Sequence, residues 1–251
     1  MGYFKSPISR EKNIWNKYSI QCRGLILDDE GIVIERCFPK FWTFRNHLNK
    51  HVASLSENKI VKLPNEKPKI YEKVDGTMGI LYWIKDAPYI ATQRSFTSLK
   101  AKKASEIIQK KYLKEAQKLD RNYSYLFEVL YKENSLVIDY KNKEDLILIG
   151  VLDKENGNQA NIDMTKLGFP TKKDYTEKYG RFDYLCELEI LDIPNLEGFV
   201  LEYSDIRIKV KFLRYKAISK EISKLVEAEF QKAKSIKILK EYYNILNIRN
   251  Y

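Results

Sequence analysis

Short apolar runs separated by turn-forming residues predict two β-hairpins in the first third of the chain. The run from Cys22 to Leu27 and the run from Ile32 to Phe38 flank an acidic turn, which predicts the first hairpin. The runs from Lys69 to Lys73 and from Met78 to Ile84 flank the dipeptide Asp75-Gly76. Because Asp-Gly between apolar runs is a strong hairpin signal, we expect a second hairpin that turns at these two residues.

Helical spacing of apolar residues occurs in two places, after the second hairpin and at the end of the chain. Thr97 and Ser98 are good N-cap residues, and the apolar residues from Leu99 to Leu119 then recur on one helix face. This pattern predicts one long amphipathic helix. From Lys216 onward apolar residues again recur at helical spacing, and we expect two helices there.

The remaining strand signals give the fold class. Runs rich in aliphatic and aromatic residues predict four further strands, at Tyr125 to Tyr131, Leu146 to Leu152, Gly198 to Tyr203 and Ile206 to Tyr215. Strands therefore outnumber helices, which predicts an α+β fold of antiparallel sheets flanked by helices. Since no repeat or flexible linker divides the sequence, we expect a main domain at residues 1–215 and a short helical extension at residues 216–251, packed on the domain or following it.

The charge of the chain narrows the class of partner. Lys and Arg number 45 against 34 Asp and Glu, which gives a formal net charge of +11 and a pI near 9.3. Such an excess attracts polyanions and releases their counterions on binding, so nucleic acid is the leading partner. A composition biased toward solvated lysines is the alternative explanation, and charge alone does not decide between the two.

Neither a membrane segment nor a disulfide framework is indicated. No stretch approaches the roughly 20 apolar residues that cross a bilayer, and Met1 to Arg10 lacks the apolar run of a secretion signal. We therefore expect a cytoplasmic protein without a membrane partner. Cys22, Cys37 and Cys186 are odd in number and widely spaced, which is typical of reduced structural cysteines.

The candidate chemistry centres on the segment Lys73-Val74-Asp75-Gly76, which has the form KxDG. Taken alone, this segment is compatible with an ordinary hairpin turn. Four other groups of residues follow the order of a known set of motifs, and several motifs in order are more specific than one. They are Arg23-Gly24, Phe127-Glu128, Glu197-Gly198-Phe199-Val200 and Lys209-Val210-Lys211. This order resembles motifs I, III, IV and V of the lysine-adenylating ligases and capping enzymes.

Three further segments narrow the resemblance to one group of RNA ligases. The segments Cys22 to Leu25, Phe38 to Phe41 and Leu146 to Val151 look like those of the tRNA-repair RNA ligases of T-even bacteriophages. The similarity spans about residues 20 to 215. It implies an ATP-dependent RNA ligase of the covalent nucleotidyltransferase superfamily, with the nucleotidyltransferase (adenylyltransferase) fold and ATP bound between its sheets.

The same resemblance implies a role for each candidate residue. Lys73 takes AMP from ATP and passes it to an RNA 5′-phosphate, after which an RNA 3′-hydroxyl displaces AMP. Glu128 contacts the nucleotide ribose, and Glu197 contacts the divalent metal, Mg²⁺ or Mn²⁺, or its water shell. Magnesium prefers one or two carboxylates plus phosphates. The other nucleotide-binding candidates, several of them matched to phosphate contacts, are Arg23, Lys40, Glu72, Gly76, Arg94, Lys209 and Lys211.

The residue types suit this chemistry on physical grounds. A lysine with an ordinary pKa near 10.4 is almost fully protonated at pH 7, so a nucleophilic lysine needs a lowered pKa. Lys209 and Lys211 lie two apart on a predicted strand and share a face, from which their charges are expected to lower the pKa of Lys73 and to hold phosphate. An edge strand with solvated lysines is the alternative. Glu128, in an otherwise apolar strand, needs a partner.

Other candidates keep a structural alternative. Arg23 could form a salt bridge within its hairpin instead of contacting phosphate. Phe41 and Trp42 could stack on a base, although buried core aromatics are more common. His47 and His51 have the i, i+4 spacing of a metal pair, but without an evident third ligand a solvated helix face is favoured.

The C-terminal end departs from the resemblance. The phage enzymes continue into a large helical domain, and residues 216–251 are too few for it or for the β-barrel of DNA ligases and capping enzymes. We therefore expect a minimal RNA ligase that acts on RNA with 5′-phosphate and 3′-hydroxyl ends. A DNA ligase, a capping-type nucleotidyltransferase and a non-catalytic RNA-binding protein on the same fold are the rivals. An end-healing kinase-phosphatase is left open as a partner.

Overall fold

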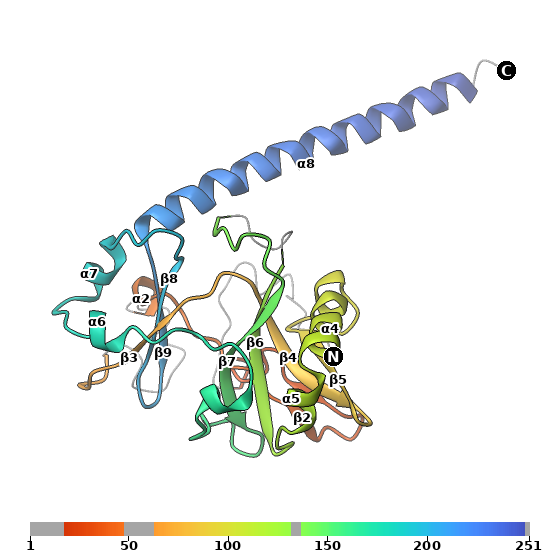
Figure 1. The fold of residues 1–251 in the computed structure, drawn as a ribbon. Coiled ribbons are helices and arrows are strands. Elements are labelled where there is room, and N and C mark those ends of the chain that lie inside the picture. Colours follow the sequence, from red (N-terminus) through yellow and green to blue (C-terminus); the bar gives the residue numbers. More distant parts are fainter. Residues whose placement is uncertain (1–17, 48–62, 132–136, 249–251) are drawn as a thin grey trace.

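Two antiparallel sheets of different size form the centre of the molecule (Figure 1). The computed structural model describes residues 18–47, 63–131 and 137–248. The larger sheet has the order β5-β4-β6-β7, built from β4 (Thr77–Ile84), β5 (Ala87–Thr92), β6 (Tyr123–Leu130) and β7 (Asp145–Asp153). The smaller sheet has the order β3-β8-β9, built from β3 (Lys69–Glu72), β8 (Gly198–Glu202) and β9 (Arg207–Lys211). The expected α+β class with antiparallel sheets is confirmed.

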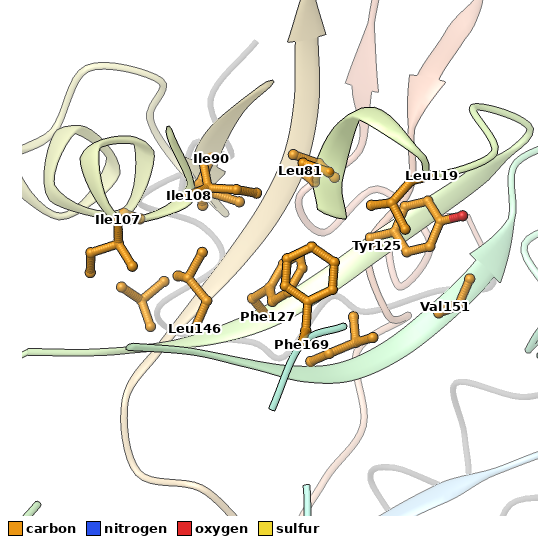
Figure 2. Packing of buried hydrophobic residues seen from close by; sticks show 14 of the residues in the cluster. Leu81, Ile90, Ile107, Ile108, Leu119, Tyr125, Phe127, Leu146, Val151 and Phe169 are labelled. Atoms are coloured by element: carbon orange, nitrogen blue, oxygen red, sulfur yellow. The ribbon is translucent and has the colours of Figure 1, made fainter. Parts of the chain in front are cut away.

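The larger sheet buries one face beneath two helices, α4 (Leu99–Lys111) and α5 (Leu113–Gln117). Ala104, Ile107 and Ile108 of α4 pack on Phe127 and Leu146 of the sheet, as Figure 2 shows for the labelled residues. The apolar face of α4 and the apolar face of the sheet thus form one core. On the opposite face, Ile80 and Leu126 pack against Phe38, and Glu128 nearby faces the functional site.

Three short helices and a 3₁₀ turn surround the strands: α2 (Phe44–His47), α6 (Thr176–Tyr179), α7 (Leu185–Ile190) and η2 (Met164–Leu167). The smaller sheet has its own core, in which Phe199 packs against Phe212 and against the aromatic pair Tyr175 and Tyr179. Because Ile208 and Val210 of β9 point into this core, the charged residues between them face the other way.

The first predicted hairpin is confirmed, although it is shorter than expected: β1 (Ile26–Leu27) pairs with β2 (Val33–Glu35). The long helix is also found, with Ser98 accepting a hydrogen bond from the Ala101 amide as its N-cap. However, it is broken at Tyr112, so α4 and α5 replace the single helix of the prediction.

The expected pair of C-terminal helices was wrong. A single helix, α8 (Leu213–Ile248), runs away from the sheets (Figure 1). No glycine or proline interrupts this segment, so the sequence has nothing that must end the first helix. Within the described ranges, no helix combines the length and apolar character that a membrane span requires.

The second predicted hairpin was also wrong. β3 pairs with β8, whereas β4 pairs with β5 and β6. The chain therefore crosses from the smaller to the larger sheet between Lys73 and Gly76 instead of turning back on itself. The Gly76 amide donates to Glu128 Oε1 over 3.1 Å, and the Asp75 amide donates to the Tyr140 hydroxyl over 2.8 Å. These long-range bonds hold the crossing in place of the hydrogen bonds of a tight turn.

Candidate active site

A cavity of about 330 Å³ lies between the two sheets. Its walls come from β3, β8 and β9 on one side and from β4, β6 and β7 on the other. The sequence-predicted residues Arg23, Glu72, Lys73, Gly76, Glu128 and Lys209 all line it. The structure therefore brings together residues from four separate segments of the chain, as expected of a nucleotide pocket between sheets.

Main-chain hydrogen bonds set the position of Lys73 relative to β8. The Lys73 amide donates to the Gly198 carbonyl over 2.9 Å, and the Phe212 amide donates to the Glu197 carbonyl over 3.0 Å. Gly198 has φ near +150°, and a Cβ there would lie 2.1 Å from the Val210 carbonyl oxygen. Only glycine fits this approach of β8 to β9, so the Glu197-Gly198 pair is a structural necessity as well as a motif.

Glu197 joins two lysines. Its Oε2 accepts from Lys73 Nζ over 2.6 Å, and its Oε1 lies 2.7 Å from Lys211 Nζ. The Glu197 side chain is only 1% exposed, and a carboxylate so deeply buried requires compensating positive charge. Neither Glu197 nor Lys211 lines the cavity itself. Glu197 holds Lys73 of the lining, and Lys211 is paired with Glu197.

The expected lowering of the Lys73 pKa was wrong for this state of the site. Burial acts to lower it, but the carboxylates of Glu197 and Glu128 outweigh burial, and the pKa lies above its ordinary value. Lys211 does not counter this, because its charge is paired with Glu197. The pKa of Lys209 falls to about 7, through burial and then the positive charges of Arg23, Lys73, Lys40 and Lys211.

Glu128 has the partner that its apolar strand requires. Its carboxylate accepts from the Gly76 amide, and burial raises its pKa to about 7 against the opposing charge of Lys73. A Cβ at Gly76 would lie 2.6 Å from the Val129 carbonyl oxygen and 2.9 Å from Glu128 Cγ. Glycine therefore lets the crossing pass close to β6, where the Glu128 side chain meets Lys73.

Aromatic rings support the cationic side of the cavity. Lys209 Nζ lies 4.2 Å from the ring centroid of Phe41, which lines the cavity. This geometry is a cation–π contact. Trp42 is not part of the lining, and the Lys40 ammonium lies 5.6 Å from its ring centroid. Lys40 thus stays outside the lining, although its charge acts on Lys209.

Arg94 is not brought to the main cavity. It lines a separate hollow of about 90 Å³ beside Gly24 and Phe96. Its neighbour Gln93 lines the main cavity instead and donates to Cys37 Sγ over 3.9 Å. His51 and the side chain of His47 lie outside the described residues, so the metal-pair alternative stays untested.

Two tyrosines that the sequence patterns do not single out fix the crossing. Tyr140 accepts from the Asp75 amide, and the Tyr215 hydroxyl is hydrogen bonded to the Asp75 carboxylate. Burial raises the pKa of Tyr215, and the nearby carboxylates of Glu197 and Asp75 raise it further. The hydroxyl therefore stays protonated and serves as a donor. Tyr215 is the final residue of the last predicted strand, but nothing local indicates that it turns toward Asp75.

A second charged group in the lining was missed by sequence reasoning. Lys172 Nζ lies 2.5 Å from Glu202 Oε1, and Arg207 Nε lies 3.2 Å from the same oxygen. Arg207 and Glu202 are cross-strand partners on β9 and β8. The alternation of side chains along these two strands could have predicted this pair. Lys172 has no such signal, because it lies in an irregular segment.

Comparison with known proteins identifies the family. A family model described as RNA ligase matches residues 21–222. The chain belongs to this RNA ligase family. A candidate RNA ligase of the bacterium Thermovibrio ammonificans is 26% identical over 210 residues, covering 80% of this chain and 49% of that protein. A candidate bifunctional polynucleotide kinase/RNA ligase of Autographa californica nuclear polyhedrosis virus is 23% identical over 201 residues, covering 72% of this chain and 28% of that protein.

The solved structures agree on the fold. The Naegleria gruberi RNA ligase with PPi superposes with a TM-score of 0.52 at 17% identity, covering 72% of this chain and 57% of that one. The expected fold, that of an RNA ligase nucleotidyltransferase domain, is thereby confirmed. The chain spans about half the length of the bacterial relative and less of the viral one.

Proposed function

We propose that this chain is an ATP-dependent RNA ligase that carries AMP covalently on Lys73. The observation that supports it most is the position of Lys73: it starts the crossing between the sheets, lines the cavity and is hydrogen bonded to Glu197. Family membership supports the reaction class. The Naegleria ligase has been solved with PPi and, in other structures, with ATP and Mn, the ligands that the proposal assigns to this cavity.

The reaction begins at Lys73 Nζ. Because its pKa is raised in the free site, Lys73 is an ammonium there and must first lose a proton to solvent. The neutral amine then attacks the α-phosphorus of ATP, so that an N–P bond forms and the bond to pyrophosphate breaks. An oxygen of an RNA 5′-phosphate then attacks the same phosphorus, which returns the electron pair to Nζ and leaves an adenylylated RNA end. Finally, an RNA 3′-hydroxyl attacks the 5′-phosphorus and releases AMP.

The lining residues divide this work. Lys209 and Arg23 face the cavity with positive charge and would hold the nucleotide phosphates, where fixed charges stabilise the transition state. Lys40 and Lys211 add to this field from outside the lining. Glu128 would accept from a ribose hydroxyl, since its second oxygen remains beside the one that holds Gly76. Glu72 and Gly76 would contact the nucleotide as parts of the wall.

A divalent metal would be held by Glu197 together with phosphate oxygens. In the described part of the chain, no group of three or more His, Cys, Asp or Glu residues forms a metal site. One carboxylate plus substrate phosphates is nevertheless the mode of binding that Mg²⁺ favours. When bound, the metal supplies charge neutralisation and orientation of the phosphate oxygens. The protein's part is to hold the Glu197 side chain in place, which its ion pairs with Lys73 and Lys211 do.

The acceptor is proposed to be RNA with a 5′-phosphate and a 3′-hydroxyl. The name of the viral relative couples a polynucleotide kinase with an RNA ligase, so a separate kinase is a suitable supplier of such ends. RNA with a 5′-hydroxyl should be joined only after treatment with a kinase. Joining of untreated 5′-hydroxyl RNA would contradict this part of the proposal.

The covalent step is tested by intact mass after incubation with ATP and Mg²⁺. The wild-type chain is expected to gain one AMP, and Lys73→Ala is expected to gain none. Lys69→Ala, an exposed position on the strand that leads into Lys73, is the matched control and should gain AMP as the wild type does. Covalent AMP on Lys73→Ala would refute the assignment.

Two comparisons separate the rivals. GTP in place of ATP distinguishes a capping-type nucleotidyltransferase, and DNA ends in place of RNA ends distinguish a DNA ligase. Retained RNA binding without any covalent nucleotide would favour a non-catalytic RNA-binding protein on the same fold.

A further inference from the structure

The end of the cavity farthest from Glu197 carries the missed charged group. β8 runs from Gly198 beside the Lys73 main chain to Glu202, which pairs with Lys69. Four residues of strand span about 13 Å. A nucleotide with its α-phosphate at Lys73 therefore has room for its sugar, and its base then points toward Glu202.

This end is closed by a segment that joins the two sheets. Thr171 forms a parallel bridge with Leu148 of β7, and Asp174 forms an antiparallel bridge with Tyr71 of β3. The Lys172 amide donates to the Leu148 carbonyl between these bridges. Lys172 is thus carried on main chain that is fixed to both walls, and its side chain is only 4% exposed.

Three charged side chains, Lys172, Glu202 and Arg207, meet at this end and all line the cavity. The Lys172 ammonium also lies 3.8 Å from the Tyr71 ring centroid, and the Arg207 guanidinium lies 4.1 Å from that of Phe38. Arg207 Nη2 donates in addition to Gln159 Oε1. Both cations are therefore held on several sides.

Only one oxygen of the Glu202 carboxylate contacts these two cations. Among the described residues, the ion pairs and hydrogen bonds of the Glu202 side chain are made by Oε1. The second oxygen, Oε2, remains as an acceptor in a wall of the cavity. A carboxylate oxygen whose group is held by two basic side chains at a mostly enclosed site is positioned to form a strong hydrogen bond with a donor on a ligand.

We propose that Glu202 is a specificity-determining residue that accepts a hydrogen bond from the 6-amino group of the adenine of ATP. Lys172 and Arg207 are positioning residues, because they act on the base through Glu202. This assignment rests on the proposed function, since it takes ATP as the nucleotide and Lys73 as the phosphate end. A base without the amino group leaves Oε2 buried without a donor, which costs about 10- to 100-fold in affinity.

The test compares the affinities for ATP and for purine ribonucleoside triphosphate, which lacks only the 6-amino group. Isothermal titration is carried out with Mg²⁺ on the Lys73→Ala chain, so that no covalent step interferes. With Glu202 intact, ATP is expected to bind about 10- to 100-fold more tightly than the purine analogue. Glu202→Leu should bring this ratio close to one, and Glu202→Gln, which keeps one carbonyl acceptor, should give an intermediate ratio.

A matched control exists elsewhere in the fold. Glu189 is a carboxylate that is likewise held by two basic residues, Arg45 and Lys216, but it does not line the cavity. Glu189→Gln is expected to lower the thermal stability while leaving the ratio of affinities unchanged. Lys172→Met is expected to lower the ratio of affinities when Glu202 is present. In a chain that already carries Glu202→Leu, Lys172→Met should leave the ratio unchanged.

Equal affinities for ATP and the purine analogue in the chain with Glu202 intact would overturn the proposal. This comparison needs no variant at position 202, so the proposal can be tested even if Glu202→Leu fails to fold. An unchanged ratio in folded Glu202→Leu would overturn it as well, as would the absence of any binding of ATP. The proposed function fails separately, when the wild-type chain binds ATP but never gains AMP by intact mass.

Discussion

Lys73 and Glu197 are 124 positions apart in the sequence, yet Nζ of the one lies 2.6 Å from Oε2 of the other. The second oxygen of Glu197 is paired with Lys211, so one buried carboxylate balances two lysines. The same carboxylate is the proposed metal ligand. Removal of this carboxylate is therefore expected to affect both Lys73 and metal binding.

Glu197→Gln is expected to slow AMP transfer to Lys73 by about 100-fold, since it removes preorganised charge from the reacting group. It should also raise the Mg²⁺ concentration for half-maximal reaction at least about ten-fold, because a neutral amide is a weaker ligand for this cation. Both are measured by intact mass across a metal titration. Glu189→Gln serves as the control, and an unchanged metal requirement would remove Glu197 from the metal site.

Lys209 should take up a proton when ATP binds. Its pKa is lowered to about 7, so about half of the free chains carry it neutral at pH 7, and bound phosphates restore the ammonium form. Uptake should be about half a proton at pH 7, approach one above pH 8 and vanish below pH 6. Affinity for ATP therefore falls as pH rises above 7.

The measurement is titration calorimetry with ATP in buffers of different ionisation enthalpy. Lys209→Met should bind ATP more weakly and lose most of the uptake at pH 8. Equal uptake in this variant and the wild type would show that another group takes the proton.

Glu35 should make stability depend on pH. It is buried beside Lys154 and Ser124, and burial raises its pKa from 4.5 to about 7. Between these values the folded chain holds the proton and the unfolded chain does not, so stability falls as pH rises through this window, by at most about 3 kcal/mol.

Glu35→Gln is expected to flatten this slope in urea unfolding followed between pH 5 and pH 8. Glu155→Gln, exposed at the neighbouring turn, should keep the slope of the wild type. If the slope survives in Glu35→Gln, the titrating group lies elsewhere.

Gly76→Ala should damage the crossing. The new Cβ meets the Val129 carbonyl oxygen at 2.6 Å, and such overpacking costs about 1–3 kcal/mol. Because the shift separates Gly76 from Glu128, AMP transfer is expected to fall by more than about ten-fold. Gly31→Ala has open space and only a positive φ, so it should cost about 1 kcal/mol and leave AMP transfer intact. Similar activity in both variants would contradict the steric argument.

The strands that alternate strongly could be predicted from the sequence, and their pairing could not. β6 and β7 are neighbours both in sequence and in the sheet, so local patterns sufficed. β3 pairs with β8, more than a hundred residues away, and no local signal competes with Asp75-Gly76 as a turn. The hairpin prediction failed there because tertiary hydrogen bonds to Tyr140 and Glu128 replaced the turn.

The candidate site shows the same division. Lys73, Glu128, Glu197 and Lys209 lie where a motif order indicates a nucleotide pocket, and the structure brings them together. The direction of the Lys73 pKa shift depends on which nearby charges form ion pairs. The spacing of residues along the sequence does not reveal that pairing. Lys172 was missed because its significance comes from a carboxylate 30 residues later.

The hydrogen bonds from the Lys73 amide to Gly198 and from the Phe212 amide to Glu197 are made by main-chain atoms alone. Substitutions other than proline at positions 73 and 197 keep these donors and acceptors. Variants that lack the side chains of residues 73 and 197 should therefore retain the backbone spacing of the site. A folded but chemically silent chain is thus attainable, and it offers a way to measure RNA capture apart from RNA joining.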